Sequence, residues 1–162
     1  MRIERIGDAT LYCGDCLDVL PGLSGVDCTI VDPPYSSGGL MRSDRVQNTN
    51  TKYVQRPKKS GYALFSGDNR DQRSLMLWSD LWMRKCLEAS APSALFLCFI
   101  DWRNLPCVVD AIQMAGWIYR GIIPWNKTQA VRPHKGCFRS QCEYVVWGTN
   151  GPNRGDKILP GF

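Results

Sequence analysis

The segment Val26–Val31 constrains the fold more than any other part of this chain. Its residues, Val-Asp-Cys-Thr-Ile-Val, are rich in β-branched side chains and nearly continuous in apolar character, which is typical of a strand covered on both faces. Asp32, Pro33, Pro34 and Tyr35 follow directly. Two prolines cannot continue a strand ladder, so the chain has to leave the sheet here. The sequence therefore predicts a buried strand with a stiff, polar exit.

Strand and helix patterns alternate along the chain. Apolar residues at helical spacing, among them Leu75, Trp82 and Cys86, predict a helix over residues 71–89 in which the tryptophans belong to the core. A second helix has Pro106 in its first turn and ends at Gly116. A short helix over 15–20 is also predicted, and the predicted strands are Ala9–Cys13, Val26–Val31, 94–100, 117–125 and 142–147. This alternation predicts an α/β, Rossmann-like domain with a mainly parallel sheet and crossover helices on its faces.

In such sheets ligands bind beyond the carboxyl ends of the strands. Asp15, the tetrapeptide 32–35, Asp101 and residues 126–139 all follow predicted strands. We therefore expect these residues to lie on one rim of the sheet.

The composition fits a single globular domain. The chain has 162 residues, of which 44% are hydrophobic and 22% charged, which excludes disordered and fibrous classes. No segment reaches the ~20 apolar residues of a membrane-spanning helix, and residues 1–5 lack the apolar run of a signal peptide. Several of the eight cysteines lie in apolar runs such as 95–100 and are interpreted as small buried hydrophobes rather than disulfide partners. We expect a soluble protein of the reducing cytoplasm.

The positive charge is concentrated in two segments that lack periodicity. The net charge of +5 favours a polyanionic partner, and clustering in loops rather than on helix faces favours DNA over an ordinary solvated surface. The candidate DNA-binding residues are Arg42, Arg45, Lys52, Arg56, Lys58, Lys59, Lys127, Arg132, His134, Lys135 and Arg139.

The tetrapeptide 32–35 brings together a carboxylate, a directed carbonyl and an aromatic ring. Pro33 has a fixed φ and Pro34 restricts the ψ of Pro33, so the Pro33 carbonyl points in a set direction. Two acceptors so placed suit the two N–H donors of an exocyclic amine on adenine or cytosine. These hydrogen bonds would localise the lone pair on the nitrogen, while Tyr35 stacks on a base rotated out of the duplex. Such a site could direct the amine at an electrophilic methyl group.

Asp32-Pro33-Pro34-Tyr35, preceded by Thr-Ile-Val, resembles the catalytic motif of S-adenosylmethionine-dependent DNA amino-methyltransferases, which modify adenine N6 or cytosine N4. The segment 12–20 is similar to that family's strand-Gly-Asp-helix segment. The resemblance implies that Asp15 and Cys16 contact the cofactor S-adenosyl-L-methionine. It also implies catalytic roles for Asp32, Pro33, Pro34 and Tyr35.

The order of the segments resembles the permuted β group of that family, which is common in bacteria and phages. Asp at position 32 favours adenine N6 as the target. The resemblance covers residues 8 to 150 and implies a catalytic segment over 1–150. Residues 151–162 would then begin a recognition region or linker.

The family also carries an Asp-Pro-Phe-x-Gly-Ser-Gly type loop for the methionine part of the cofactor, and this sequence contains no such segment. The chain therefore resembles the catalytic half of the domain. We expect that a C-terminal half or a second subunit completes it. A DNA-binding half or remnant without turnover is the corresponding alternative function.

Other interpretations of single motifs remain open. Cys13 and Cys16 form a C-x-x-C pair at a strand-to-helix junction, as in thiol-disulfide oxidoreductases. The same pair could join His134, Cys137 or Cys142 in a zinc site, although the ligand spacing is poor and no metal is expected. Asp15 could simply cap a helix, a role compatible with cofactor binding.

Overall fold

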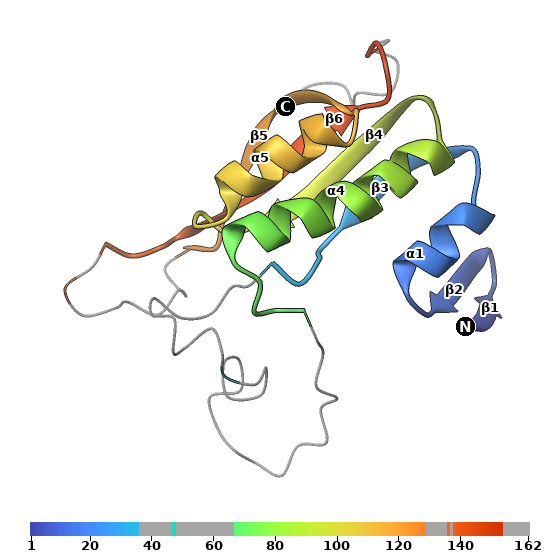
Figure 1. Cartoon of the computed structure of the whole chain (residues 1–162), viewed down its shortest axis with the longest axis horizontal. Coiled ribbons are helices and arrows are strands. Elements are labelled where there is room, and N and C mark those ends of the chain that lie inside the picture. Colours follow the sequence, from blue (N-terminus) through green and yellow to red (C-terminus); the bar gives the residue numbers. More distant parts are fainter. Residues whose placement is uncertain (36–46, 48–66, 129–135, 137, 154–162) are drawn as a thin grey trace.

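The computed structural model describes residues 1–35, 47, 67–128, 136 and 138–153. They form a two-stranded hairpin, a four-stranded sheet and a layer of two long helices (Figure 1). Among the described residues, no helix is both long enough and apolar enough to cross a membrane.

The N-terminal hairpin consists of β1 (Arg2–Ile6) and β2 (Ala9–Cys13), which pair antiparallel. Gly7 turns the chain with φ at 57°, a conformation that glycine adopts without strain. The sequence analysis predicted β2 but missed β1. The predicted short helix is present as α1 (Cys16–Val19), followed by the 3₁₀ turn η1 (Leu20–Gly22).

The main sheet has the order β3-β4-β6-β5. Its strands are β3 (Val26–Val31), β4 (Ser90–Ile100), β5 (Ile118–Asn126) and β6 (Cys142–Thr149). β3 and β4 are parallel, whereas β6 is antiparallel to both β4 and β5. Three strands thus run in one direction and β6 runs against them, which confirms the α/β class and the mainly parallel sheet. β6 is antiparallel to its neighbours because β5 and β6 form a hairpin, which needs no crossover helix.

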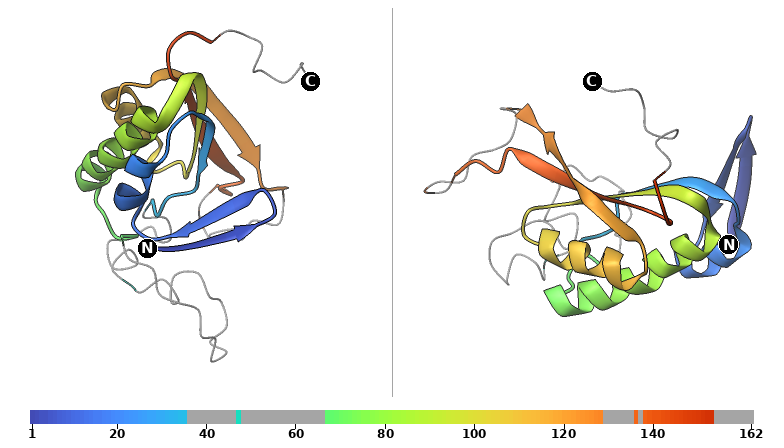
Figure 2. Two further views of the ribbon diagram at one scale, coloured as in Figure 1. Left: turned by 90° about the vertical axis from the view of Figure 1, so that its right-hand side faces the viewer. Right: turned by 90° about the horizontal axis from the view of Figure 1, so that it is seen from above.

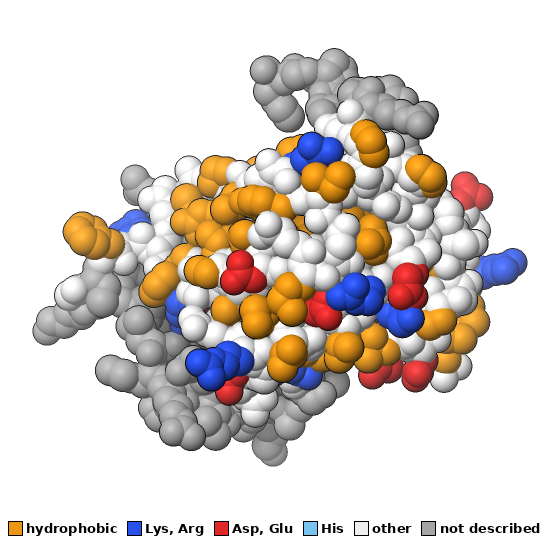
Figure 3. Space-filling model, turned by 45° about the horizontal axis from the view of Figure 1, so that its top comes forward, with side chains coloured by type: hydrophobic (Ala, Val, Ile, Leu, Met, Phe, Trp, Pro, Cys, Tyr) orange, Lys and Arg blue, Asp and Glu red, His pale blue; other side chains and the backbone are white. Residues whose placement is uncertain are grey.

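Both long helices lie on one face of this sheet (Figure 2, right). α4 (Gln72–Ala89) begins where the Asp71 side chain accepts a hydrogen bond from the Ser74 backbone N–H at 2.8 Å. α5 (Leu105–Met114) has Pro106 in its first turn, and Gly116 follows with φ at 95°. The outer surface of α4 carries the ion pairs Arg84–Asp80 and Lys85–Glu88, and Figure 3 shows acidic and basic side chains interspersed there.

The core fills the space between these helices and the sheet. Phe96 of β4 lies between two tryptophans, with ring centroids 6.0 Å from Trp82 and 4.8 Å from Trp117. The Trp117 indole N–H donates to the Met83 carbonyl at 3.0 Å, so its one polar atom is satisfied in the core. The interpretation of the α4 aromatic stripe as core is thereby confirmed, since Trp78 also packs against this cluster.

No described helix covers the opposite face of the sheet, and no residue of β3 is fully buried, which contradicts the prediction that β3 is covered on both faces. Ile30 pairs with Leu97, and Phe99 pairs with Val145, so these side chains point away from the helix-facing Cys98. Ile30 is 67% exposed and Trp125, on the same face, is 51% exposed. The apolar composition of β3 was interpreted correctly, but both long helices lie on one face, and no described helix covers the other.

Candidate functional site

The tetrapeptide 32–35 leaves β3 at the carboxyl end of that strand. The last register pair joins Val31 to Cys98, after which no ladder partner follows. Asp32 is exposed, and the two prolines and Tyr35 are partly buried. The predicted departure of the chain from the sheet at the two prolines is therefore present, and it begins at an exposed residue, Asp32.

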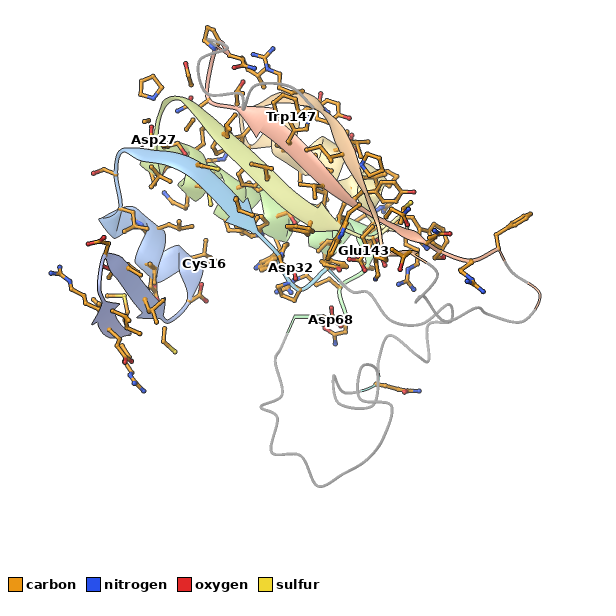
Figure 4. The ribbon with its side chains drawn as sticks, turned by 180° about the vertical axis from the view of Figure 1, so that it is seen from behind. Cys16, Asp27, Asp32, Asp68, Glu143 and Trp147 are labelled. Carbon is orange, nitrogen blue, oxygen red and sulfur yellow. The ribbon has the colours of Figure 1, made fainter. Side chains whose placement is uncertain are left out.

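The carboxylate of Asp32 lies in an acidic part of the rim. Partial burial raises the pKa of the Asp32 carboxyl, and the negative charge of Glu143 raises it further. Figure 4 shows Asp32 and Glu143 at the same end of the sheet, while Asp27 lies at the other end of β3. Within the described part of the chain, Asp32 forms no ion pair. An acceptor held in this way is available to an incoming donor.

Glu143 lies at the start of β6 and has a cationic partner. The Lys127 ammonium, directly after β5, forms an ion pair and hydrogen bond with it. The sequence analysis assigned Lys127 to DNA phosphates and did not single out Glu143. Only the sheet topology brings these two residues together, because they are 16 positions apart on the two strands of the β5–β6 hairpin.

The tetrapeptide is also held from the α5 side. The Asn104 side-chain amide donates to the Tyr35 carbonyl at 2.7 Å. Tyr35 packs with part of its surface against the hydrophobic core cluster. Asp101, which follows β4, is buried and accepts hydrogen bonds from Arg103 and Asn104. The sequence analysis placed Asp101 on this rim, and it missed Asn104 because nothing in the local pattern marks a bond over 69 residues.

Asp15 follows β2, which belongs to the separate hairpin and not to the main sheet. We expected Asp15 to share a rim with the tetrapeptide because both follow strands of one sheet. That reason was wrong, since the two strands belong to different sheets. Its side chain accepts a hydrogen bond from the Leu17 backbone N–H at 2.9 Å, which confirms the capping role. Leu17 and Leu20 pack against the core cluster and thereby attach α1 and η1 to the main domain.

Cys16 is next to this cap. Partial burial raises the pKa of its thiol, and the charge of Asp15 raises it further. A thiol-disulfide oxidoreductase needs an acidified thiol at such a position. The structure therefore opposes the thiol interpretation at Cys16. Burial also raises the pKa of Cys86 to about 12, in line with a thiol that serves as a small core residue.

Most predicted DNA-binding residues lie outside the described part of the chain, as do His134 and Cys137 of the zinc alternative. The positions concerned are Arg42, Arg45, Lys52, Arg56, Lys58, Lys59, Arg132, His134, Lys135 and Cys137. Lys127 and Arg139 are described. Arg139 is exposed, close in sequence to the start of β6, where the basic segment rejoins the sheet.

The base of that segment is tied together by hydrogen bonds. The Lys127 N–H donates to the Gln141 carbonyl at 2.9 Å. Asn126 Oδ1 accepts from the Thr128 N–H at 2.8 Å and from the Gln141 side-chain amide at 3.0 Å. Both ends of the basic segment are thus anchored at the rim that carries Asp32.

A family model described as DNA methylase matches residues 26–159. The chain belongs to the DNA methylase family. The matched range contains the tetrapeptide, the whole main sheet and both long helices. The sequence-based assignment to the DNA amino-methyltransferases is confirmed.

Solved structures of low sequence identity share the fold of this methylase chain. The M1.HpyAVI–SAM complex gives a TM-score of 0.53 at 14% identity, covering 85% of this chain and 51% of that one. TTHA0409 from Thermus thermophilus gives 0.56 at 13% identity, covering 91% and 59%. Its complex with S-adenosyl-L-methionine gives 0.53 at 14% identity, covering 91% and 58%. The chain thus spans little more than half the length of these structures. No curated protein matches it.

Proposed function

We propose that this methylase chain transfers a methyl group from S-adenosyl-L-methionine to adenine N6 of a base flipped out of DNA. The observation that carries the proposal is the exit of Asp32-Pro33-Pro34-Tyr35 from β3 with its carboxylate exposed at the carboxyl end of the strand. Ligands of α/β sheets bind at this edge. Family membership supports methyl transfer to DNA. The choice of adenine over cytosine rests on Asp at position 32, by its resemblance to the motif of the adenine-modifying enzymes.

The chemistry assigned to the chain is the activation of an amine by two acceptors. Asp32 and the Pro33 carbonyl accept the two N–H groups, which localises the nitrogen lone pair. Bound S-adenosyl-L-methionine would supply an electrophilic methyl group on its sulfonium and would keep the electron pair of the S–C bond. Asp32 and solvent would then receive the proton that the methylated amine releases.

Tyr35 serves as the stacking partner of the flipped base. Tyr35 is partly buried and packs against the core cluster, which restricts its side-chain rotamers. Little further side-chain entropy is therefore lost when a base stacks on it. The stacking prediction is compatible with this placement because the residue keeps part of its surface exposed.

The residues assigned to the cofactor fit one part of it. Asp15 is exposed and uses one oxygen to cap α1, so its second oxygen can accept from the adenine amine of the cofactor. Cys16 is exposed beside it. Because the sequence has no glycine loop of the family type for the methionine part, we propose that a C-terminal half or a second subunit supplies it.

The proposed partner is double-stranded DNA, bound through Lys127, Arg139 and the basic residues outside the described part. Phosphate contacts from such loops position a duplex without reading its sequence. The described cysteines are free thiols, which supports a place in the reducing cytoplasm.

The product of the reaction tests the proposal. The chain, together with the half or subunit that completes it, is incubated with unmethylated bacteriophage DNA and S-adenosyl-L-methionine with a labelled methyl group, and the DNA is digested to nucleosides and analysed by mass spectrometry. We expect label in N6-methyladenine. Label in N4-methylcytosine would contradict the adenine assignment. DNA binding without cofactor binding, measured by calorimetry, would support a non-catalytic half instead.

Glu143→Gln is expected to move the acid limb of the pH profile to lower pH. The ionised Asp32 is the active form, so activity is lost as pH falls through the raised pKa of Asp32. Glu143→Gln removes the negative charge that helps to raise the pKa of Asp32, so that pKa falls. The measurement is kcat/KM against pH for both proteins. An unchanged or upward-shifted limb would show that Glu143 does not act on Asp32.

A further inference from the structure

The turn between β4 and α5 is built around a buried aspartate. Asp101 is 6% exposed and its Oδ1 accepts the backbone N–H groups of Arg103 at 3.0 Å and Asn104 at 3.2 Å. Its Oδ2 accepts from Arg103 Nε at 2.8 Å and Nη2 at 2.6 Å. Four hydrogen bonds to one carboxylate fix the backbone from Asp101 to Asn104.

Asn104 is the N-cap residue of α5, yet its side chain makes no capping hydrogen bond. Asparagine is favoured at this position because its side-chain oxygen usually accepts a backbone N–H of the first turn. Here the side chain is directed instead across the rim, and Nδ2 donates to the Tyr35 carbonyl at 2.7 Å. Because a carbonyl can only accept, the amide nitrogen must face it. The Asn104 side chain therefore makes a long-range hydrogen bond to Tyr35 instead of capping α5.

That contact fixes the C-terminal end of the tetrapeptide, at Tyr35. The near end is held by the β3–β4 ladder, whose last pair joins Val31 and Cys98. Between the two fixed points stand only Asp32 and the two prolines, which have few backbone conformations. Asn104 is itself 7% exposed, so solvent does not compete for its amide.

We propose that Asn104 is a positioning residue for methyl transfer, which acts by fixing the Tyr35 carbonyl and so aligning Asp32 and the Pro33 carbonyl on the amine. The inference rests on the proposed function. It adds a residue from a different element, held in place by Asp101, to the machinery that the tetrapeptide provides.

The test is Asn104→Asp in protein that transfers methyl groups. Aspartate has nearly the same shape and caps a helix as well as asparagine does, but its carboxylate cannot donate to the Tyr35 carbonyl. We expect kcat to fall by about 30- to 100-fold, because a small misplacement of reacting groups has effects of this order. The KM for cofactor and the Kd for DNA are expected to change by less than about 3-fold.

Gln113→Glu is the matched control. It makes the same amide-to-carboxylate change on the same helix. Gln113 lies at the far end of α5 from Asn104, and its Nε2 donates to the Val109 carbonyl over a distance of 2.8 Å. We expect its kcat to equal that of the parent. A kcat for Asn104→Asp within about 3-fold of the parent, in protein that unfolds cooperatively, would overturn the proposal.

A second readout does not depend on turnover. Tyrosines are replaced by 3-fluorotyrosine, and the fluorine resonance of Tyr35 is assigned by its loss in Tyr35→Phe. We expect that resonance to shift or broaden in Asn104→Ser, whose hydroxyl is a good N-cap group for α5 but is too short to reach the carbonyl. An unchanged resonance would contradict the proposal that Asn104 fixes the Tyr35 carbonyl. Failure of the parent to methylate DNA would contradict the proposed function alone, because the fluorine experiment still reports on Asn104.

Discussion

Asp32→Ala is expected to reduce methyl transfer by at least about 100-fold while DNA binding stays within about 3-fold of the parent. The substitution removes one of the two acceptors that we propose to act on the amine, and the loss of one such electrostatic contact costs about 10²- to 10³-fold in kcat. The measurements are single-turnover methyl transfer and a DNA-binding titration. Retained activity would refute the assignment of Asp32.

The same variant has a distinctive effect on stability. The raised pKa of Asp32 means that the folded chain holds this proton more tightly than the unfolded chain does. Stability from this group therefore falls as pH rises through that pKa, and the ionised carboxylate is unfavourable at neutral pH. Asp32→Ala is expected to melt at the parent temperature or slightly above it. A loss of activity through unfolding is thus separable from a loss of chemistry.

Asp27→Ala provides the control for this experiment. Asp27 is exposed on the same strand but lies at its opposite end, away from the rim (Figure 4). The change of residue type is identical. We expect this variant to keep the methyl-transfer rate of the parent, since Asp27 is far from the acceptors.

Leu75→Ala is expected to lower the free energy of unfolding by about 2–5 kcal/mol, whereas Leu77→Ala changes it by less than about 0.5 kcal/mol. Both leucines are in α4, but Leu75 is 1% exposed and Leu77 is 60% exposed. Their helix propensities are equal, so the difference isolates burial and the cavity left behind.

Urea denaturation of the two variants measures this difference. The slope of the free energy of unfolding against urea concentration should be the same in both variants, so that the unfolding midpoints alone report the change in stability. Equal midpoints for the two variants would contradict the burial of Leu75.

Secondary structure was largely predictable from the sequence because the local signals agree with the fold. Asp71 ahead of a helical stripe, Pro106 in a first turn and Gly116 after a last turn each mark a boundary that the structure reproduces. β1 was missed because charged residues separate its apolar positions. The Gly7-Asp8 turn signal that follows could have revealed it as half of a hairpin.

The candidate site was only partly predictable. The tetrapeptide 32–35 could be found because its chemistry is contained in consecutive residues. Glu143 and Asn104 could not, because their roles arise from strand order and from a bond between distant segments. The coverage of β3 was also mispredicted, since periodicity reports how apolar a strand is and not which neighbours cover it.

The antiparallel β5–β6 hairpin separates the segment between its two strands from the rest of the rim. Register is fixed beneath the basic segment by the Asn126–Cys142 pair and by the hydrogen bonds of Gln141. Insertions or replacements beyond Lys127 therefore need not shift either strand, because loop closure costs grow only slowly with length. A different segment can therefore be inserted at this position while Asp32 and the residues packed around it keep their places.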